Sequence, residues 1–221
     1  MPKQIMRNPA AALQNMVIAR DVLAARGVRL SLAFGTLLGA LRERNFIAHD
    51  DDVDVLVLPG DEAAFLAAFS ELEARGLEFL EKLEEPRVYS FVRRGEQIDF
   101  FVARECRYGL LRRRGWDLDG RESIPYRHLR ELDTLEFLGE KFHVPSDPYG
   151  VVRNLYGRTW DIPIAGRPAR IDNLVRLRKV AAHPQKALFY LLRFTSMRLK
   201  WAGFARKARA RSRSNGEGGL E

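Results

Sequence analysis

The sequence predicts an α+β domain in which helices flank a mixed β-sheet, followed by a basic amphipathic helix at the C-terminal end. Short valine-rich and aromatic runs, typical of strands, alternate with segments whose apolar residues recur at helical spacing. The 221 residues, 46% of them apolar, suffice for one hydrophobic core and an appendage. Residues 173–216 contain twelve Lys or Arg and no Asp or Glu. We therefore expect a folded domain over residues 1–170 and a basic helical tail over 171–221, disordered at its end.

The net charge of +8 belongs to this tail. Residues 1–172 hold 25 basic and 27 acidic residues, so the domain itself offers a poor general surface for nucleic acid. The single cysteine, Cys106, excludes an internal disulfide, and neither zinc-type Cys/His spacing nor a signal peptide is apparent. No apolar run reaches the roughly 18 residues of a membrane span. We expect a cytoplasmic protein, which would be peripheral at the inner face of the membrane if its tail binds lipid.

The first elements lead to a glycine–threonine pair. Asn8-Pro9 provides a cap and a first-turn proline for a helix that ends at Gly27. Residues 28–34 then predict a strand, and residues 37–42 predict a short helix. The free N–H groups at the start of this helix point toward Gly35-Thr36, so the turn is expected to bind an anion.

Residues 50–57 are the most informative part of the chain. Aspartate occupies positions 50, 51, 52 and 54, at the start of an apolar, valine-rich strand. Because side chains alternate along a strand, Asp52 and Asp54 share one face, while Asp50 and Asp51 shape the loop or support the site from outside. Carboxylates this close raise one another's pKa, and a divalent cation with oxygen ligands relieves the repulsion. The cluster therefore predicts a metal site.

The next elements supply a third carboxylate. After Pro59-Gly60-Asp61, apolar spacing predicts a helix closed by Gly76, followed by a hairpin of strands 88–92 and 97–102. Asp99 interrupts the second, otherwise apolar strand, and a buried carboxylate is rare unless it is paired or binds a metal. We expect Asp99 to complete the metal site; an aspartate on a solvated edge strand is the alternative.

The remaining segments suggest packing. Residues 104–145 contain arginine clusters and a strand pair near 135–144, and they point to no function. Ser146-Asp147-Pro148 caps a short helix that ends at Tyr156-Gly157. From 184 to 207, an apolar stripe lies opposite basic residues spaced by seven. That helix either lies in an anionic membrane surface or docks on the domain with its basic side in water.

The run GTLLGALRERNFIAHDDDVDV, residues 35–55, resembles the LicD family, the phosphorylcholine transferases that include fukutin-like proteins. Ile98-Asp99-Phe100 stands where the third carboxylate of such proteins belongs. The later Tyr156-Gly157-x-x-Trp160-x-x-Pro163 is similar to the closing motif of the family. The chain departs from the family at Ala48-His49, where a proline and an aromatic residue are common. His49 is then a proton carrier, a phosphate contact or a spacer.

The resemblance implies the nucleotidyltransferase fold of DNA polymerase beta and a phosphotransferase. The implied reaction moves a phospho-alcohol, phosphocholine or a phospho-polyol, from a CDP-activated donor to a hydroxyl of a glycan or lipid-linked glycan and releases CMP. Such reactions modify cell-surface glycans, as in lipopolysaccharide or teichoic acid biosynthesis.

The resemblance also implies roles for particular residues. Asp52, Asp54 and Asp99 would hold Mg²⁺ or Mn²⁺ and act in catalysis. The backbone N–H groups of Gly35-Thr36 would cradle the diphosphate. Arg42 would supply a countercharge for the donor phosphate.

Two alternatives remain open. A nucleotidyltransferase on the same fold would use an NTP and leave the NMP on its product. Small nucleotidyltransferases of that kind carry Gly-Ser and a shorter gap to the paired aspartates, unlike the Gly-Thr and long gap seen here. In a different class, the basic tail would make the protein a nucleic-acid-binding or membrane-docked module.

Overall fold

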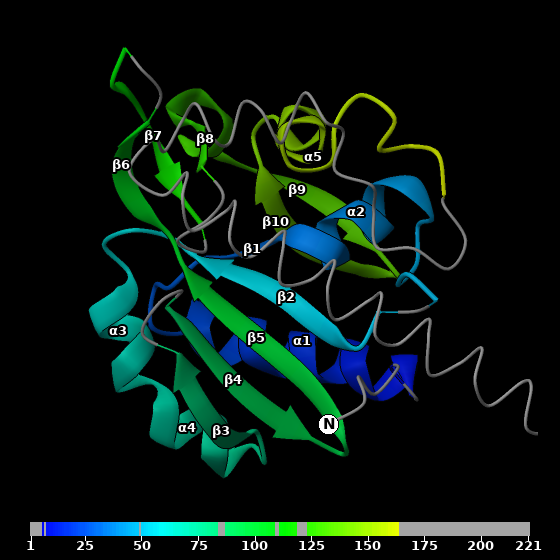
Figure 1. The fold of residues 1–221 in the computed structure, drawn as a ribbon. Coiled ribbons are helices and arrows are strands. Elements are labelled where there is room, and N and C mark those ends of the chain that lie inside the picture. The colour runs from blue at the N-terminus through cyan, green and yellow to red at the C-terminus, as the bar shows by residue number, and fades with distance from the viewer. Residues whose placement is uncertain are drawn as a thin grey trace, which may run out of the picture. The chain divides into compact units, whose positions relative to one another are not determined.

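The structure, a computed structural model, describes residues 6, 8–48, 50–83, 87–108, 111–118 and 123–163 (Figure 1). Within these residues, seven strands form a mixed sheet and three form a smaller one. In spatial order, the large sheet contains β3 (Glu78–Leu83), β4 (Val88–Arg93), β5 (Glu96–Val102), β2 (Asp52–Val57), β1 (Leu30–Leu32), β10 (Glu140–Pro145) and β9 (Leu132–Phe137). The small sheet contains β6 (Arg104–Tyr108), β7 (Arg113–Asp117) and β8 (Ser123–Pro125). The helices are α1 (Pro9–Ala24), α2 (Phe34–Arg42), α3 (Glu62–Ala67), α4 (Phe69–Ala74), the 3₁₀ helix η1 (Tyr126–Leu129) and α5 (Pro148–Tyr156).

The predicted α+β class, a mixed sheet flanked by helices, is confirmed. Strand β2 pairs in parallel with β5, and β1 pairs in parallel with β10, whereas the other neighbours are antiparallel. The expected hairpin is β4–β5, turned by Arg94-Gly95. The strand pair expected near 135–144 is β9–β10, and the helix capped by Asp147 is α5.

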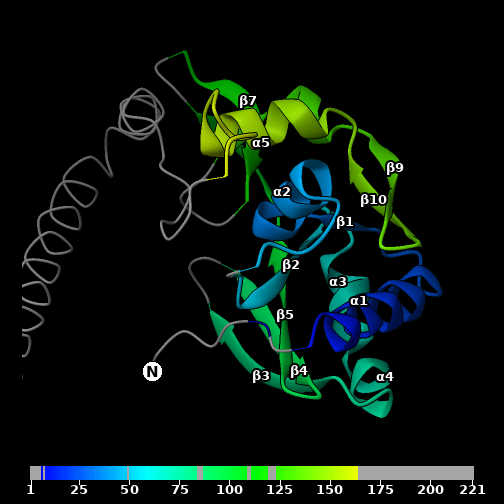
Figure 2. The same ribbon diagram turned by 90° about the vertical axis from the view of Figure 1, so that its right-hand side faces the viewer.

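The helices lie on the large sheet in two groups. Helices α1, α3 and α4 lie on one side of strands β2, β5 and β4 (Figure 2). They cover the face that bears Val53, Val55 and Val57, all of which are buried. Helix α2 instead packs against β2 and α5. The other face of β2 and β5, which carries the aspartates, therefore meets the start of α2.

Two helices differ from the prediction. Sequence spacing favours one helix up to Gly76, but the structure divides it into α3 and α4 because the Ala68 N–H donates to the carbonyl of Phe65, only three residues back. Helix α2 begins at Phe34, three residues before the predicted start, because Ala33 N–H and Gly35 N–H both donate to Asp54 and fix the chain on either side of Phe34. Gly35-Thr36 thus belongs to the first helical turn.

Aromatic side chains join α3 and α4 to the sheet. Phe65 is fully buried, and its ring centroid lies 5.1 Å from Phe100 and 5.4 Å from Tyr89. Phe69 continues the cluster with a centroid 5.0 Å from Phe91. Rings in these edge-on and tilted arrangements add a specific attraction to the burial of their surface. This core fixes the strands that position the carboxylates.

The C-terminal tail lies outside the described residues. The chain divides into a unit of residues 1–176 and a second of 177–221, and residues beyond 163 are not described. The boundary after residue 170, the basic helix, its membrane contact through 184–207 and its disordered end therefore stay predictions. Among the helices that the structure describes, none is long and apolar enough to cross a bilayer.

Phe65→Ala is expected to lower the free energy of unfolding by about 3–5 kcal/mol, because it leaves a cavity among aromatic rings. The control is Leu66→Ala on the same helix, where the side chain is 41% exposed and the loss should stay below about 1 kcal/mol. Denaturant unfolding measures both values. Equal losses would contradict the assignment of Phe65 to the core.

Candidate active site

Two parallel strands bring three carboxylates together. Asp54 on β2 lies directly beside Asp99 on β5, and Asp52 lies beside Gln97. One oxygen each of Asp52, Asp54 and Asp99 lies within 4.8 Å of the others. Asp54 is 8% exposed and Asp99 is 9% exposed. The residues that the sequence predicts as metal ligands therefore converge at one point on the sheet.

The start of α2 is fastened to Asp54 by three hydrogen bonds. Gly35 N–H donates to Asp54 Oδ2 over 2.9 Å, and the Asp54 N–H donates to the buried Thr36 hydroxyl over 2.9 Å. Ala33 N–H donates to the Asp54 carbonyl over 3.1 Å. Gly35 and Thr36, predicted to cradle a diphosphate, thus orient the central carboxylate. Their phosphate contact stays a prediction.

Gly35 must be glycine for steric reasons. A Cβ at this position would overlap Asp50 Oδ2 and lie 3.3 Å from Asp54 Oδ2. Any larger residue would therefore push at least one carboxylate aside. The glycine lets the backbone of α2 approach the acidic cluster closely enough for its N–H to reach Asp54.

The carboxylates are poised for a cation. Burial, followed by the charges of Asp52 and Asp50, holds the pKa of Asp54 well above its usual range, against the opposing hydrogen bond from Gly35. Burial also raises the pKa of Asp99. Ionising these groups together is unfavourable without a nearby positive charge. A set of carboxylate oxygens is the donor type that hard divalent cations prefer, so the residues present fit such a metal.

Asp50 and Asp51 lie beside this set. Oxygens of Asp50, Asp51 and Asp52 also lie within 4.8 Å of one another, and all three residues are half-buried. The Asp50 N–H donates to the carbonyl of Ile47, and its own carbonyl accepts from Met6 N–H. These bonds hold the loop that delivers the chain to β2. His49, the family departure noted above, lies outside the described residues.

Arg42 contacts the end of the domain. Its guanidinium donates to the Glu43 carboxylate and, over 3.3 Å, to the carbonyl of Trp160. Its side chain is 10% exposed. Seven residues of helix, about 10 Å, separate Arg42 from Gly35. In the described residues Arg42 therefore joins α2 to the segment after α5, and its contact with donor phosphate stays a prediction.

Sequence reasoning missed two residues that hold Asp99. Ser90 lies opposite Asp99 on β4 and hydrogen-bonds its carboxylate, and Gln97 Nε2 donates to Asp99 Oδ1 over 2.8 Å. Both bonds favour the ionised carboxylate and oppose the effect of burial. The signal was present in the sequence, because a two-residue turn at Arg94-Gly95 places Ser90 across from Asp99.

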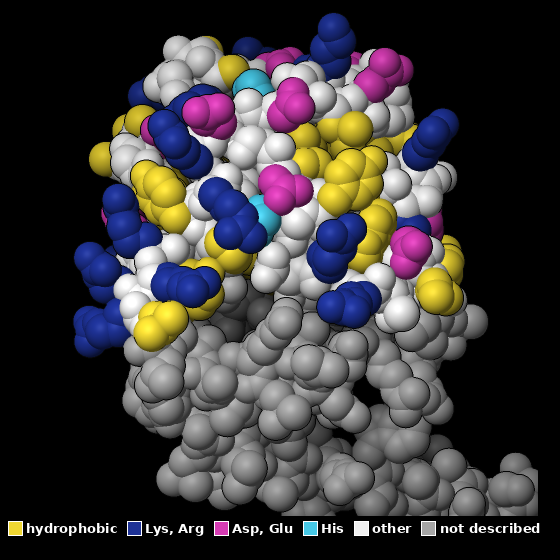
Figure 3. Space-filling view, turned by 90° about the horizontal axis from the view of Figure 1, so that it is seen from above, with side chains coloured by type: hydrophobic (Ala, Val, Ile, Leu, Met, Phe, Trp, Pro, Cys, Tyr) yellow, Lys and Arg dark blue, Asp and Glu magenta, His cyan; other side chains and the backbone are white. Residues whose placement is uncertain are grey.

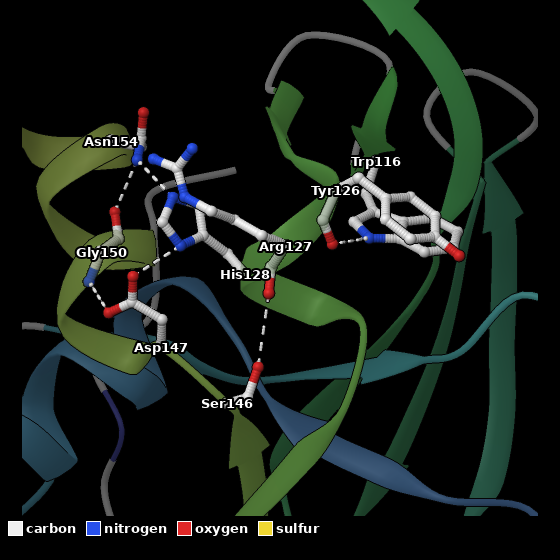
Figure 4. Close-up of polar contacts among 8 residues, drawn as sticks. All are labelled: Trp116, Tyr126, Arg127, His128, Ser146, Asp147, Gly150 and Asn154. Carbon is white, nitrogen blue, oxygen red and sulfur yellow. Dashed lines mark hydrogen bonds and ion pairs between the residues drawn. The ribbon is translucent and has the colours of Figure 1, made fainter. Parts of the chain in front are cut away.

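A second polar group, of which the sequence predicted only the Asp147 cap, ties η1 to α5 (Figure 4). His128 is 3% exposed, and its Nδ1 lies 2.7 Å from Asp147 Oδ2. Asp147 Oδ1 caps α5 by accepting from Gly150 N–H, and Asn154 Nδ2 lies 3.3 Å from His128 Nε2. Burial lowers the pKa of His128, against the attraction of Asp147, so the ring is neutral at neutral pH. This group holds η1, which directly follows β8, against α5.

Exposed arginines gather at this end of the molecule, where Figure 3 shows several Lys and Arg side chains. The arginines of β6, β7 and the turn between them are exposed, and Arg114 lies over the ring of Tyr126, which stacks on Trp116. The Trp116 indole donates to the carbonyl of Tyr126 (Figure 4). The arginine cluster noted in the sequence, Arg112 to Arg114, is therefore exposed to solvent at the small sheet.

The part of the chain that carries this site matches a known protein family. The family model "LicD/FKTN/FKRP, nucleotidyltransferase domain" matches residues 27–147, which include all three carboxylates. The chain belongs to this family. As a LicD-family nucleotidyltransferase domain, it is a transferase of phosphorus-containing groups, and its acidic cluster is suited to a divalent metal.

Two of the similar solved structures are of the antibiotic-resistance factor ANT(2'')-Ia. Its solution structure matches with a TM-score of 0.48 and 12% identity, covering 92% of this chain and 100% of that one. Its crystal structure in complex with adenylyl-2''-tobramycin matches with a TM-score of 0.45 and 16% identity, and the match covers 84% of this chain and 98% of that one. No curated protein matches the sequence.

Asp54→Asn is expected to raise the Tm of this LicD-family domain by several degrees in EDTA at neutral pH. The raised pKa of Asp54 means that the fold favours its protonated form, so stability is lost as pH rises through that pKa. The advantage of asparagine should therefore be largest at neutral pH and vanish below the usual aspartate pKa of 3.8. Thermal unfolding across this pH range measures the difference.

The same variant should lose stabilisation by metal. Mn²⁺ is expected to raise the Tm of the parent protein and to leave Asp54→Asn nearly unchanged, because a ligand stabilises only the fold that binds it. Glu136→Gln, at an exposed position on β9, removes one carboxylate elsewhere and should behave as the parent protein. A lower Tm of Asp54→Asn in EDTA at neutral pH would contradict the account of the cluster.

Proposed function

We propose that the chain is a metal-dependent phosphotransferase that uses a CDP-activated alcohol, such as CDP-choline or a CDP-polyol, as donor. The acceptor is a hydroxyl of a glycan or lipid-linked glycan. The observation that carries the proposal is the convergence of Asp52, Asp54 and Asp99 on one face of two parallel strands. Family membership supports it, because the match spans the strands that carry these residues.

The reaction replaces a phosphoanhydride bond of the donor with a phosphoester bond to the acceptor. The acceptor hydroxyl oxygen bonds to the phosphorus that carries the alcohol, and the bond from that phosphorus to the bridging oxygen of CMP breaks. CMP leaves with that oxygen, and the acceptor gains the phospho-alcohol. The hydroxyl proton is released to a base in the site. No redox partner is needed for this balance.

Each of the described site residues has a separate role in the proposed reaction. Asp52, Asp54 and Asp99 would hold Mg²⁺ or Mn²⁺, which neutralises diphosphate charge when bound. Asp54, the central carboxylate, is fixed by Gly35 and Thr36 and sets the position of the three-carboxylate cluster. Asp99, held by hydrogen bonds from Ser90 on β4 and Gln97 on β5, is the candidate acceptor of the hydroxyl proton. Phosphoryl transfer requires mainly positioning and charge neutralisation, which rigid strands provide.

A nucleotidyltransferase that uses an NTP is the second candidate. The description of the matching family model, a nucleotidyltransferase domain, favours it. The two reactions differ in what the product keeps: NMP in nucleotidyl transfer, the phospho-alcohol alone in the proposed reaction. Product mass separates them. If the protein instead acts by binding nucleic acid through its basic tail, deletion of the residues after Asn173 should abolish nucleic-acid binding.

Titration calorimetry tests the donor. We expect one of CDP-choline, CDP-ribitol or CDP-glycerol to bind in Mn²⁺ more tightly than CTP and ATP, and to lose binding in EDTA. Metal-dependent preference for a triphosphate would favour nucleotidyl transfer. Equal binding in Mn²⁺ and EDTA would contradict the role of the carboxylates.

Asp52→Asn and Asp99→Asn are each expected to lower kcat by about a thousandfold, because each keeps the shape of the side chain and removes its charge. Turnover of the donor identified by calorimetry measures the loss. Glu136→Gln is the control and should retain full turnover. Near-parental activity of either aspartate variant would remove that residue from the mechanism.

A further inference from the structure

An aromatic pair lies on the same sheet face as the carboxylates. Phe101 follows Asp99 by two residues on β5, so both side chains point to one face, and Leu56 on β2 lies beside it. The ring of Phe34, at the start of α2, lies with its centroid 4.6 Å from that of Phe101. Both rings are half-buried, whereas Phe65, Phe91 and Phe100 on the helix-covered face are fully buried. The Phe34–Phe101 pair therefore keeps ring surface open beside the acidic site.

The spacing along β5 suits a nucleotide. Two residues of strand span about 7 Å, so Phe101 lies roughly that far beyond Asp99. In a nucleotide, the ribose separates the base from the phosphates by a comparable length. A nucleoside diphosphate whose phosphates lie at the carboxylates therefore places the flat face of its base near these rings.

The backbone of Phe34 adopts a strained conformation. Its φ is 37°, a left-handed conformation that costs a bulky L-residue on the order of 1–2 kcal/mol. Hydrogen bonds on both sides maintain the strain, since Ala33 N–H and Gly35 N–H donate to Asp54. Strained residues that the surrounding structure maintains concentrate at functional sites. The bonds that orient the central carboxylate thus also fix the position of Phe34.

We propose that Phe34 and Phe101 form the platform on which the nucleobase of the donor stacks. The inference rests on the proposed function and extends it, because it assigns the recognition of a nucleoside diphosphate to two residues beside the carboxylates. Stacking on an aromatic ring contributes about 1–3 kcal/mol per base and tolerates any base. The platform therefore distinguishes a nucleotide from a bare diphosphate, and leaves discrimination between bases to polar contacts.

The test compares ligands with and without a base. Titration calorimetry in Mn²⁺ measures the affinity of CDP, ADP and inorganic pyrophosphate for the parent protein, Phe34→Leu and Phe101→Leu. Each leucine variant keeps an apolar side chain and loses the ring. We expect both to weaken CDP and ADP about fivefold or more and to leave pyrophosphate within about twofold of the parent value. Phe101→Tyr keeps the ring and should retain CDP affinity.

Phe79→Leu serves as the matched control. Phe79 is a 39% exposed phenylalanine on β3 that packs against Phe69 and Phe91 on the opposite face of the sheet. This variant should bind all three ligands as the parent does. Parental CDP affinity in both leucine variants would overturn the platform, and so would equal weakening of CDP and pyrophosphate. If the parent protein binds CDP and ADP no better in Mn²⁺ than in EDTA, the proposed function fails and the platform fails with it.

Discussion

Mutual repulsion among buried carboxylates is the constraint on which the rest of the structure depends. Asp54 and Asp99 lie side by side on parallel strands and are nearly excluded from water. One carboxylate oxygen of Asp52 lies within 4.8 Å of an oxygen of each. The pKa of Asp54 lies well above its usual range because burial and neighbouring charges disfavour its ionised form. A fold that keeps such a group in place loses stability at a site whose oxygen atoms suit a divalent cation.

The architecture opposes this repulsion from two sides. On the helix-covered face, the aromatic cluster around Phe65 fixes α3 and α4 on the sheet. On the other face, Gly35 and Thr36 fasten the start of α2 to Asp54. The carboxylates therefore stand on rigid elements, as phosphoryl transfer requires, because most of its catalysis comes from positioning.

Local patterns in the sequence identified the three converging carboxylates, whereas the contacts that orient them depend on tertiary structure. Alternation along residues 52–57 and the interruption of an apolar strand by Asp99 were sufficient to predict three converging carboxylates. The parallel pairing of β2 with β5 joins residues 45 positions apart and has no local signal. The carbonyl of Trp160 beside Arg42 likewise comes from a distant segment. The small sheet was missed because its arginine-rich strands lack clear apolar alternation.

Anomalous diffraction from crystals grown with Mn²⁺ and CDP would locate the metal. We expect an anomalous peak about 2.1 Å from oxygens of Asp52, Asp54 and Asp99, with the diphosphate of CDP on the same ion. A peak coordinated by Asp50 and Asp51 without Asp99, or an empty cluster with CDP bound elsewhere, would contradict it.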